Sequence, residues 1–198
     1  NKFFLVDNHL LLMAGAKVVV YGLSTEGYAI ASQMAIKGAD VSIIDESTPS
    51  AISLKAEIAK TYPNVSSLKE DEPLLAMEPI DVAISKAQYL FFTPRIRKTG
   101  QDIKTEIHSK FKDAVTSLKK NSSVIFTLAT GFGGNNENIS LLEHVTGLQA
   151  GKNISYFYYP LEDLNQQPKI IGSFNGKKDP ILADLLGNTK KEKEFVAI

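Results

Sequence analysis

Short apolar stretches alternate with amphipathic ones along most of this chain, beginning near residue 17. Val18–Tyr21 is an apolar, mostly β-branched run bounded by glycine, a pattern typical of a strand buried on both faces. A helix is predicted from about residue 26 to residue 37, where a glycine ends it, and Val41–Ile44 is predicted as the next strand. Together these stretches predict a strand–turn–helix–strand unit closed by Asp45.

The rest of the chain continues this alternation. Residues 50–60 have helical spacing, whereas the acidic, proline-containing residues 65–79 are predicted to be irregular. Further strands are predicted at Tyr89–Thr93, Ser123–Leu128, Ile154–Tyr158 and Lys169–Ile171, and helices at Ile80–Ala87, Ile103–Lys119, Glu137–Val145 and Pro180–Leu186. Strands that alternate with helices predict an α/β, Rossmann-like, doubly wound and mostly parallel sheet with helices on both faces.

The length of 198 residues is enough for one domain with a substantial core. We expect an N-terminal arm at residues 1–15, a nucleotide-binding domain at 16–187 and a charged C-terminal segment at 188–198 that begins a connection to a missing part. Because the chain starts without a methionine and stops just after a charged run, we expect it to be the ordered part of a longer polypeptide, or a fragment of one.

The composition narrows the classes of function. The formal net charge is zero, with 22 residues of each sign, so the sequence shows no electrostatic footprint for nucleic acid or an anionic membrane. No apolar run is long enough to span a membrane, and no cluster with metal-ligand spacing occurs. The chain has no cysteine, which excludes disulfides and a cysteine nucleophile within it and is compatible with a cytoplasmic location.

The turn after the first strand carries the strongest chemical signal. Residues 22–27, Gly-Leu-Ser-Thr-Glu-Gly, occupy the place of the dinucleotide fingerprint G-x-G-x-x-G. The first glycine permits a sharp turn, the helix N-terminus offers N–H groups to a pyrophosphate, and Asp45 can accept from the ribose hydroxyls. We therefore predict NAD as the cofactor, bound by Gly22, Leu23, Ser24, Thr25, Glu26, Gly27 and Asp45.

Two features of this fingerprint qualify the prediction. Ser24 replaces the middle glycine, and its Cβ would push a pyrophosphate slightly away, so a unit that binds nothing, or another nucleotide, stays an open alternative. Asp45 and the neighbouring Glu46 would repel a 2′-phosphate, so NAD is expected to bind better than NADP.

Ligands of open α/β sheets bind at the carboxyl ends of the strands. The loops that follow Tyr21, Asp45, Thr93 and Leu128 are therefore expected to surround one site. Pro94 ends the strand before it, because proline removes a backbone donor and restricts the residue that precedes it.

Downstream motifs carry a resemblance to a known family. Residues 89–115, YLFFTPRIRKTGQDIKTEIHSKFKDAV, resemble the strand ending in Thr-Pro, the loop and the helix of the UDP-glucose/GDP-mannose dehydrogenase family. Residues 123–163 are similar to that family's second block, in which a strand runs into Ser-Thr-Val and a later Tyr-x-Pro-Glu, and IIGSFNG resembles its following Val-Ile-Gly-Gly strand. The similarity covers about residues 16–187 in the family's order.

This resemblance implies roles for individual residues. Thr93 and Pro94 would line the nicotinamide side of an NAD site, and Thr130 would match the threonine near the reacting centre, so all three are also expected to contact the cofactor. Gly134 and Glu137 match the glycine and glutamate of the loop that follows.

The chain also departs from the family's pattern. Ala129 and Gly131 replace its serine and valine, and Leu161 stands where the family has a glutamate, with Glu162 one place later. Thr130 and Glu162 are the catalytic candidates that remain. The family's catalytic cysteine lies in a second half that these residues do not contain.

Other polar residues have competing interpretations. The histidines, His9, His108 and His144, lack clustered partners and are expected to be surface or packing residues rather than catalysts. Loop residues Arg95, Arg97 and Lys98 could contact a phosphate or be solvated, and Glu162 with Asp163 could cap a turn. Tyr156–Tyr159 could offer a stacking surface, although alternation along a strand would place two of these four residues in the core.

Three hypotheses follow. The chain is an NAD-binding domain, the cofactor half of a nucleotide-sugar 6-dehydrogenase-like oxidoreductase that is incomplete for catalysis as given. Alternatively, it is a non-catalytic, dehydrogenase-like nucleotide-binding or assembly module. A relative of the β-hydroxyacid dehydrogenases shares the fold but also needs a second domain. The favoured partner is a nucleotide-sugar or other small molecule, without nucleic acid or membrane, and a homo-oligomer is allowed.

Overall fold

The computed structural model has a nine-stranded sheet with helices on both faces, and it describes residues 15–47, 50–97, 99–100, 102–131, 133–161, 167–187 and 193–198. The strand order is β4-β3-β2-β1-β5-β6-β7-β8-β9. The strands are β1 (Lys17–Tyr21), β2 (Asp40–Ile44), β3 (Ser50–Leu54), β4 (Met77–Pro79), β5 (Tyr89–Phe92), β6 (Ser123–Phe126), β7 (Ser155–Tyr158), β8 (Ile170–Ser173) and β9 (Glu194–Ala197). The helices are α2 (Thr25–Ile36), α3 (Ala56–Thr61), α4 (Val65–Glu70), α5 (Ile80–Lys86), α6 (Asp102–Val115), α7 (Gly134–Thr146) and α8 (Pro180–Leu186), with the 3-10 turns η1 (Glu72–Leu74) and η3 (Phe174–Gly176).

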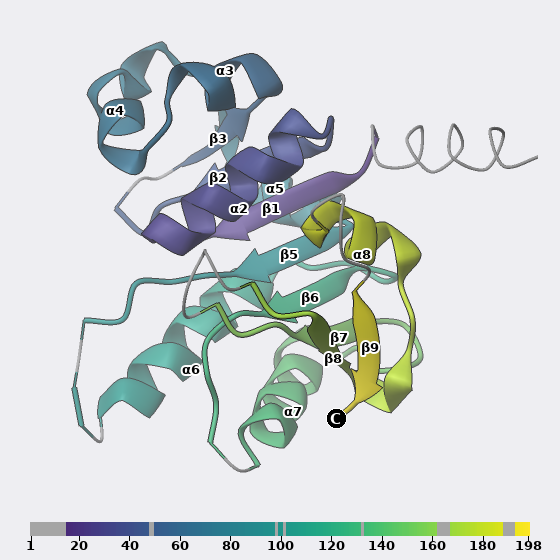
Figure 1. Ribbon diagram of the computed structural model, residues 1–198. Coiled ribbons are helices and arrows are strands. Elements are labelled where there is room, and N and C mark those ends of the chain that lie inside the picture. The colour runs from purple at the N-terminus through teal and green to yellow at the C-terminus, as the bar shows by residue number, and fades with distance from the viewer. Residues whose placement is uncertain are drawn as a thin grey trace, which may run out of the picture.

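The adjacent strands β2, β1, β5, β6 and β7 are all parallel and form the centre of the sheet (Figure 1). From β1 the chain moves outward to β2, β3 and β4 and then returns to the other side of β1 as β5. The direction of winding therefore reverses between β1 and β5, which is where open α/β sheets bind ligands. The predicted fold, a Rossmann-like, doubly wound and mostly parallel sheet, is confirmed.

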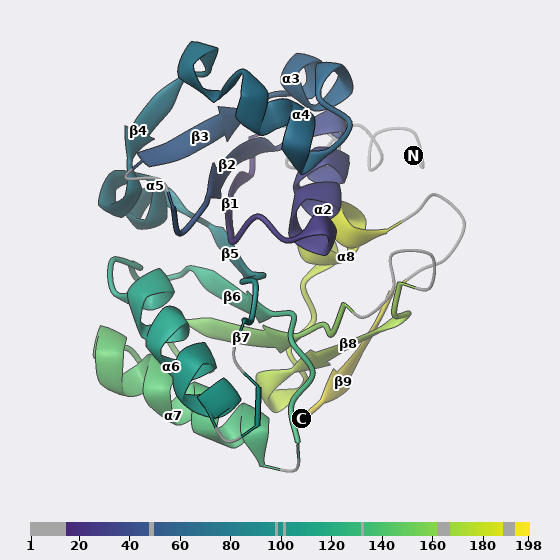
Figure 2. The same ribbon diagram turned by 90° about the vertical axis from the view of Figure 1, so that its left-hand side faces the viewer.

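Two hydrophobic cores lie on opposite faces of the sheet. Helices α2, α3, α4 and α8 pack on one face, whereas α5, α6 and α7 pack on the other (Figure 2). Alternate residues of β1 point into each core, so Val18 and Val20 contact the α2 side, and Val19 and Tyr21 contact the α6 side. Burial on both faces explains why the central strands are continuous apolar runs rather than alternating ones.

The region between β2 and β5 corrects two predictions. Residues 50–60, predicted as one helix, form strand β3, antiparallel to β2, followed by α3. Residues 65–79, predicted as irregular, contain α4, η1 and the edge strand β4. In residues 50–54 the buried side chains are Ala51, Ile52 and Leu54. These residues form a strand despite their helical spacing, because they pair with β2 on one side and β4 on the other.

Smaller differences occur at element ends. Helix α6 ends at Val115, before the predicted Lys119, and α7 begins at Gly134 rather than at Glu137. Strand β8 runs antiparallel to β7, and β9, within residues 188–198, adds a parallel edge strand that the sequence did not predict. Every helix within the described residues is too short or too polar to span a bilayer.

Candidate functional site

The turn between β1 and α2 is built around the end of β5. Gly22 has a φ of +108°, and a Cβ there would meet the Thr93 carbonyl oxygen and, at 2.6 Å, the Cα of Pro94. A Cβ on Gly27 would meet the Thr93 Oγ1 and, at 2.9 Å, the Gly22 carbonyl oxygen. Glycine is therefore required at the first and third fingerprint positions, because Thr93 packs directly on the turn.

Thr93 also holds the turn by hydrogen bonds. Its amide donates to the Tyr21 carbonyl (2.8 Å), and its hydroxyl donates to the carbonyls of Gly22 (3.1 Å) and Tyr21 (3.3 Å). Thr93 is only 2% exposed, so these bonds are shielded from water. The carboxyl end of β5 is thereby fixed against the carboxyl end of β1.

Ser24, the residue that departs from the fingerprint, is the N-cap of α2. Its hydroxyl accepts from the amide of Gly27 at 3.0 Å, and its φ and ψ of −68° and 160° are those of an N-cap. The serine therefore takes up one of the amides at the start of the helix. The amides of Thr25 and Glu26 lie before this capped position, at the end of α2 that carries partial positive charge.

Asp45 follows the end of β2, beside the turn. The amide of Gly22 donates to the Ile44 carbonyl at 2.7 Å, which joins the turn to this strand end. Asp45 is 8% exposed, and both the Ser47 hydroxyl and the Lys69 ammonium approach its Oδ2 at 2.8 Å. Burial alone would raise the pKa of Asp45, but the hydrogen bonds from Lys69 and Ser47 outweigh it and hold the pKa below its ordinary value.

A second lysine joins the loops after β2 and β5. The Lys110 ammonium, from α6, is 2.9 Å from Glu46 and from Glu106, and it donates to the Arg95 carbonyl at 2.6 Å. Partial burial opposes its charge, but the two carboxylates raise the pKa of Lys110 above its ordinary value. Arg95 in turn donates through Nε to the Leu23 carbonyl at 2.7 Å. The loops after β1, β2 and β5 thus form one connected edge, as predicted.

The loop after β6 completes this edge of the sheet. The Thr127 hydroxyl donates to the Phe92 carbonyl at 2.6 Å, which places the end of β6 beside the end of β5. Further along, the amide of Thr130 donates to the Tyr158 hydroxyl at 3.0 Å. A Cβ on Gly134 would be 2.6 Å from the Cβ of Thr130, so the first residue of α7 packs tightly against this loop.

Thr130 lines a cavity of about 570 Å³ between α6, α7 and the end of β6. Its walls include Ile107 and Phe126, together with His108 and Glu137. The Lys104 ammonium is 2.7 Å from Glu137 and lowers its pKa, with a smaller effect from His108, whose Nε2 is 3.9 Å away. Glu137, matched to the family's glutamate, is therefore a paired carboxylate at the cavity rim.

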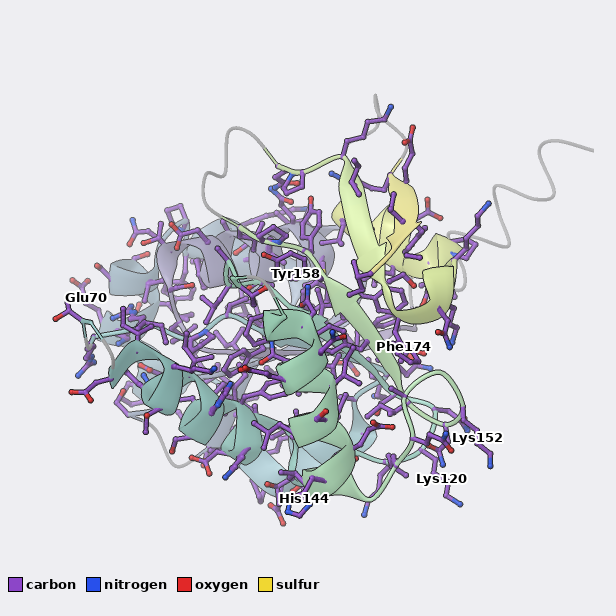
Figure 3. The ribbon with its side chains drawn as sticks, turned by 90° about the horizontal axis from the view of Figure 1, so that it is seen from below. Glu70, Lys120, His144, Lys152, Tyr158 and Phe174 are labelled. Carbon is purple, nitrogen blue, oxygen red and sulfur yellow. The ribbon has the colours of Figure 1, made fainter. Side chains whose placement is uncertain are left out.

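The other residues that the sequence singled out lie in different parts of the structure. Leu161 packs against the core on the α2 side, and its amide donates to the Thr127 carbonyl at 2.9 Å. Figure 3 shows His144 at the opposite end of α7 from Tyr158, far from the carboxyl edge of the sheet. Tyr158 alone of residues 156–159 is partly exposed, whereas the other three are buried, one more than alternation predicted. Glu162, Asp163, Lys98 and His9 lie outside the described residues, and no metal-binding group of carboxylates and histidines occurs among those the structure does describe.

Two lysine side chains at this edge, Lys69 and Lys110, were not predicted from the sequence. A signal for Lys69 was present in the sequence, because Pro63-Asn64 is a helix-start pattern and the Asn64 side chain does cap α4 by accepting from the Ser67 amide at 2.9 Å. For Lys110, Glu106 four residues earlier on α6 is a local partner, but Glu46 and the Arg95 carbonyl come from loops that are distant in sequence.

No known family model and no curated protein matches this chain. Solved structures do share its fold. An NDP-N-acetyl-D-galactosaminuronic acid dehydrogenase from Methanosarcina mazei Go1 is 14% identical, with 96% of this chain and 46% of that chain covered and a TM-score of 0.63. A UDP-D-ManNAc dehydrogenase from Pyrococcus horikoshii is 18% identical, with 91% and 46% covered and a TM-score of 0.61. A GDP-mannose dehydrogenase from Pseudomonas aeruginosa, solved as a ternary complex, is 13% identical, with 91% and 46% covered and a TM-score of 0.61.

The chain thus spans about half the length of these nucleotide-sugar dehydrogenases. At these identities the similarity is one of fold. The resemblance stated from the sequence is confirmed at that level, across nearly the whole chain.

Proposed function

We propose that this chain binds NAD(H) at the carboxyl ends of β1, β2 and β5, as the cofactor half of a nucleotide-sugar dehydrogenase-like oxidoreductase that is incomplete for catalysis in these 198 residues. The observation that carries the proposal is the glycine turn. Gly22 and Gly27 both face Thr93, and the turn is hydrogen-bonded to the end of β2, where Asp45 follows. This is the arrangement in which a dinucleotide crosses the strand ends of a doubly wound sheet.

Each part of the edge suits one part of the cofactor. The start of α2 and the exposed Arg95 side chain, held beside the turn by its bond to Leu23, provide positive charge for a pyrophosphate. Asp45 is the acceptor for the adenosine ribose hydroxyls. Thr93 and Pro94 lie between this end and the loop of Thr130, and they would line the nicotinamide side. A bound nicotinamide would supply hydride transfer, and the chain's residues would supply position and charge.

Ser24 is compatible with this proposal. Its hydroxyl is turned back to cap α2, so the side chain is directed at the helix and not away from it. Because the amide of Gly27 donates to this hydroxyl, it is not available to donate to a ligand. We therefore expect a dissociation constant for NAD(H) in the micromolar to millimolar range, which corresponds to a favourable binding free energy of roughly 4–8 kcal/mol.

A non-catalytic nucleotide-binding module remains the second candidate, and one observation favours it. Leu161, in the place of the family's glutamate, is packed against a hydrophobic core and cannot carry a proton. Thr130 and Glu162 stay predicted catalytic residues of the first candidate, and the cytoplasmic location and self-association stay predictions of both.

Isothermal titration calorimetry of the folded protein with NAD⁺ and NADH tests the proposal. We expect a saturable heat, and a matching rise in melting temperature, because a ligand that binds only the native state stabilises it. Absence of both at millimolar cofactor, in a sample whose circular dichroism shows the folded state, would overturn the proposal.

A further inference from the structure

Lys69 is paired with the carboxylate that would bind the cofactor ribose. It lies on α4, in the excursion of the chain between β2 and β5, and its Nζ is 2.8 Å from Asp45 Oδ2. The Lys69 side chain is 37% exposed and that of Asp45 is 11% exposed. The lysine side chain is therefore more exposed than that of Asp45, and we expect a ligand that reaches Asp45 to meet Lys69 as well.

The position of this lysine is fixed by its helix. The neighbouring Leu68 is fully buried in the core on the α2 side, and the Asn64 side chain caps the helix start. Tyr62, before the helix, donates its hydroxyl to Asp71 at 3.0 Å, and its carbonyl accepts from the Tyr28 hydroxyl. Packing on both sides of Lys69 thus holds its ammonium at the end of β2.

The two lysines also change the charge of this end of the site. Asp45 and Glu46 alone would present two negative charges to the ribose, which disfavours a 2′-phosphate. In the structure Lys69 pairs with Asp45, and Lys110 pairs with Glu46 at 2.9 Å. Lys110 also pairs with Glu106 at 2.9 Å, so the three carboxylates and two ammonium groups together carry one net negative charge, less than the carboxylates alone would carry. Lys69 adds N–H donors that suit phosphate oxygens.

We propose that Lys69 is a specificity-determining residue that gives the adenosine end of this site tolerance for a 2′-phosphate, so that NADP(H) is accepted beside NAD(H). The inference rests on the proposed dinucleotide site and goes beyond it, because it assigns the choice between the two cofactors to a residue outside the fingerprint. Asp45 accepts from a 2′-hydroxyl, whereas Lys69 donates to a 2′-phosphate at the same place.

The test is the ratio of the dissociation constants for NADP⁺ and NAD⁺, measured by calorimetry. Lys69→Gln removes the donor and the positive charge beside Asp45, so the ratio should rise about tenfold or more, since hydrogen bonds to charged groups are among the stronger ones. Lys60→Gln is the matched control, because it removes the same charge from an exposed position on the neighbouring α3. The control should leave the ratio within about twofold of the unmodified protein, since exposed distant charges are screened.

Two further measurements keep the test independent of folding and of the nicotinamide half. Asp45→Asn, which keeps Lys69, should lower the ratio, whereas Lys69→Arg should leave it nearly unchanged. The pair 5′-AMP and adenosine 2′,5′-bisphosphate, which differ only in the 2′-phosphate, should show the same direction of change for Lys69→Gln.

The outcomes are distinguishable. If NAD⁺ binds but Lys69→Gln changes the ratio no more than Lys60→Gln does, the role of Lys69 is refuted and the proposed function stands. If Lys69→Gln does not fold, an unchanged ratio in Asp45→Asn refutes it instead. If the unmodified protein binds neither dinucleotide, the proposed function fails and the inference fails with it.

Discussion

Thr93 explains why two separated glycines are needed in one turn. Its backbone lies against Gly22 and its hydroxyl against Gly27, so the single buried residue that follows β5 requires glycine at both positions. The fingerprint in this chain therefore has an internal packing reason in addition to any ligand. Ser24 has a different role, because its side chain caps the start of α2.

Gly27→Ala tests this packing. The new Cβ must displace the Thr93 hydroxyl, which breaks its hydrogen bonds to the turn, so we expect a loss of about 1–3 kcal/mol of the free energy of unfolding. Gly131→Ala is the matched control, because a Cβ there meets no atom within 4 Å, and its effect should stay within about 0.5 kcal/mol. Urea denaturation measures both. Equal effects would show that Thr93 does not constrain the turn.

Arg95 and Arg97 form a natural pair for testing the phosphate side. Arg95 is oriented toward the turn by its bond to Leu23, whereas for Arg97 the contact found is from its backbone amide to Glu106. Arg95→Gln should weaken NAD⁺ binding about tenfold, the size expected for one charge-assisted hydrogen bond, and Arg97→Gln should weaken it by no more than about twofold. Calorimetry at constant salt compares them, and equal losses would place the pyrophosphate elsewhere.

At the level of elements, α2 does more than present its start to the site. Near its other end, Lys37 donates to the carbonyls of Asp184 and Leu185 at 2.8 and 3.0 Å and also to that of Gly187. These are carbonyls at the C-terminal end of α8, which lack helical partners. Lys37 thus joins α2 to α8, two of the helices that cover one face of the sheet.

Removal of this link should destabilise the fold. Lys37→Met loses three hydrogen bonds to the end of α8, and we expect a loss of about 1–3 kcal/mol in the free energy of unfolding. Lys17→Met is the control, because its ion pair with Asp40 is about half exposed on both sides (51% and 48%) and should contribute at most about 1 kcal/mol. Chemical denaturation of the two variants measures both losses. A loss for Lys37→Met no larger than that for Lys17→Met would contradict the stabilising role of Lys37.

The elements that were predicted correctly are those with local signals. The unit from β1 through α2 to β2 was predicted to within one residue, because buried β-branched runs and glycine boundaries specify it without distant contacts. Strand β3 was missed, since Ile52, Ala56 and Ala59 happen to have helical spacing and only pairing with β2 and β4 reveals a strand. Strand β9 was missed for the same reason, because it exists as the edge partner of β8.

The candidate site shows the same division. The sequence predicted which loops meet, because parallel strands end at one edge of the sheet. It did not predict that Asp45 and Glu46 are paired with Lys69 and Lys110, because both lysines come from helices that follow later in the chain. The charge at the ribose end, and so the expected cofactor preference, depends on these tertiary contacts.

At the scale of the whole molecule, this chain corresponds to about half of each longer chain in the solved structures compared with it. They span 46% of the three nucleotide-sugar dehydrogenases compared, and these 198 residues include no cysteine. In the dehydrogenase family that the sequence resembles, the second oxidation needs a thiolate, and a sugar-nucleotide pocket closes over the cofactor from another domain.

We therefore expect the 198-residue chain alone not to reduce NAD⁺ with UDP-glucose, other UDP-sugars or GDP-mannose. The assay is NADH absorbance with saturating cofactor, with a complete nucleotide-sugar dehydrogenase as positive control. Turnover by this chain alone would contradict the expectation and direct attention to Thr130 and Glu162.

The central claim, a dinucleotide site at the carboxyl ends of β1, β2 and β5, is tested most directly by a residue-resolved titration. Amide chemical shifts of ¹⁵N-labelled protein would be followed as NAD⁺ is added up to millimolar concentration. We predict saturable shifts concentrated at residues 22–27, Asp45 and Thr93–Arg95, with one dissociation constant common to all of them. Shifts that do not saturate, or saturable shifts confined to another place such as the cavity between α6 and α7, would contradict the account.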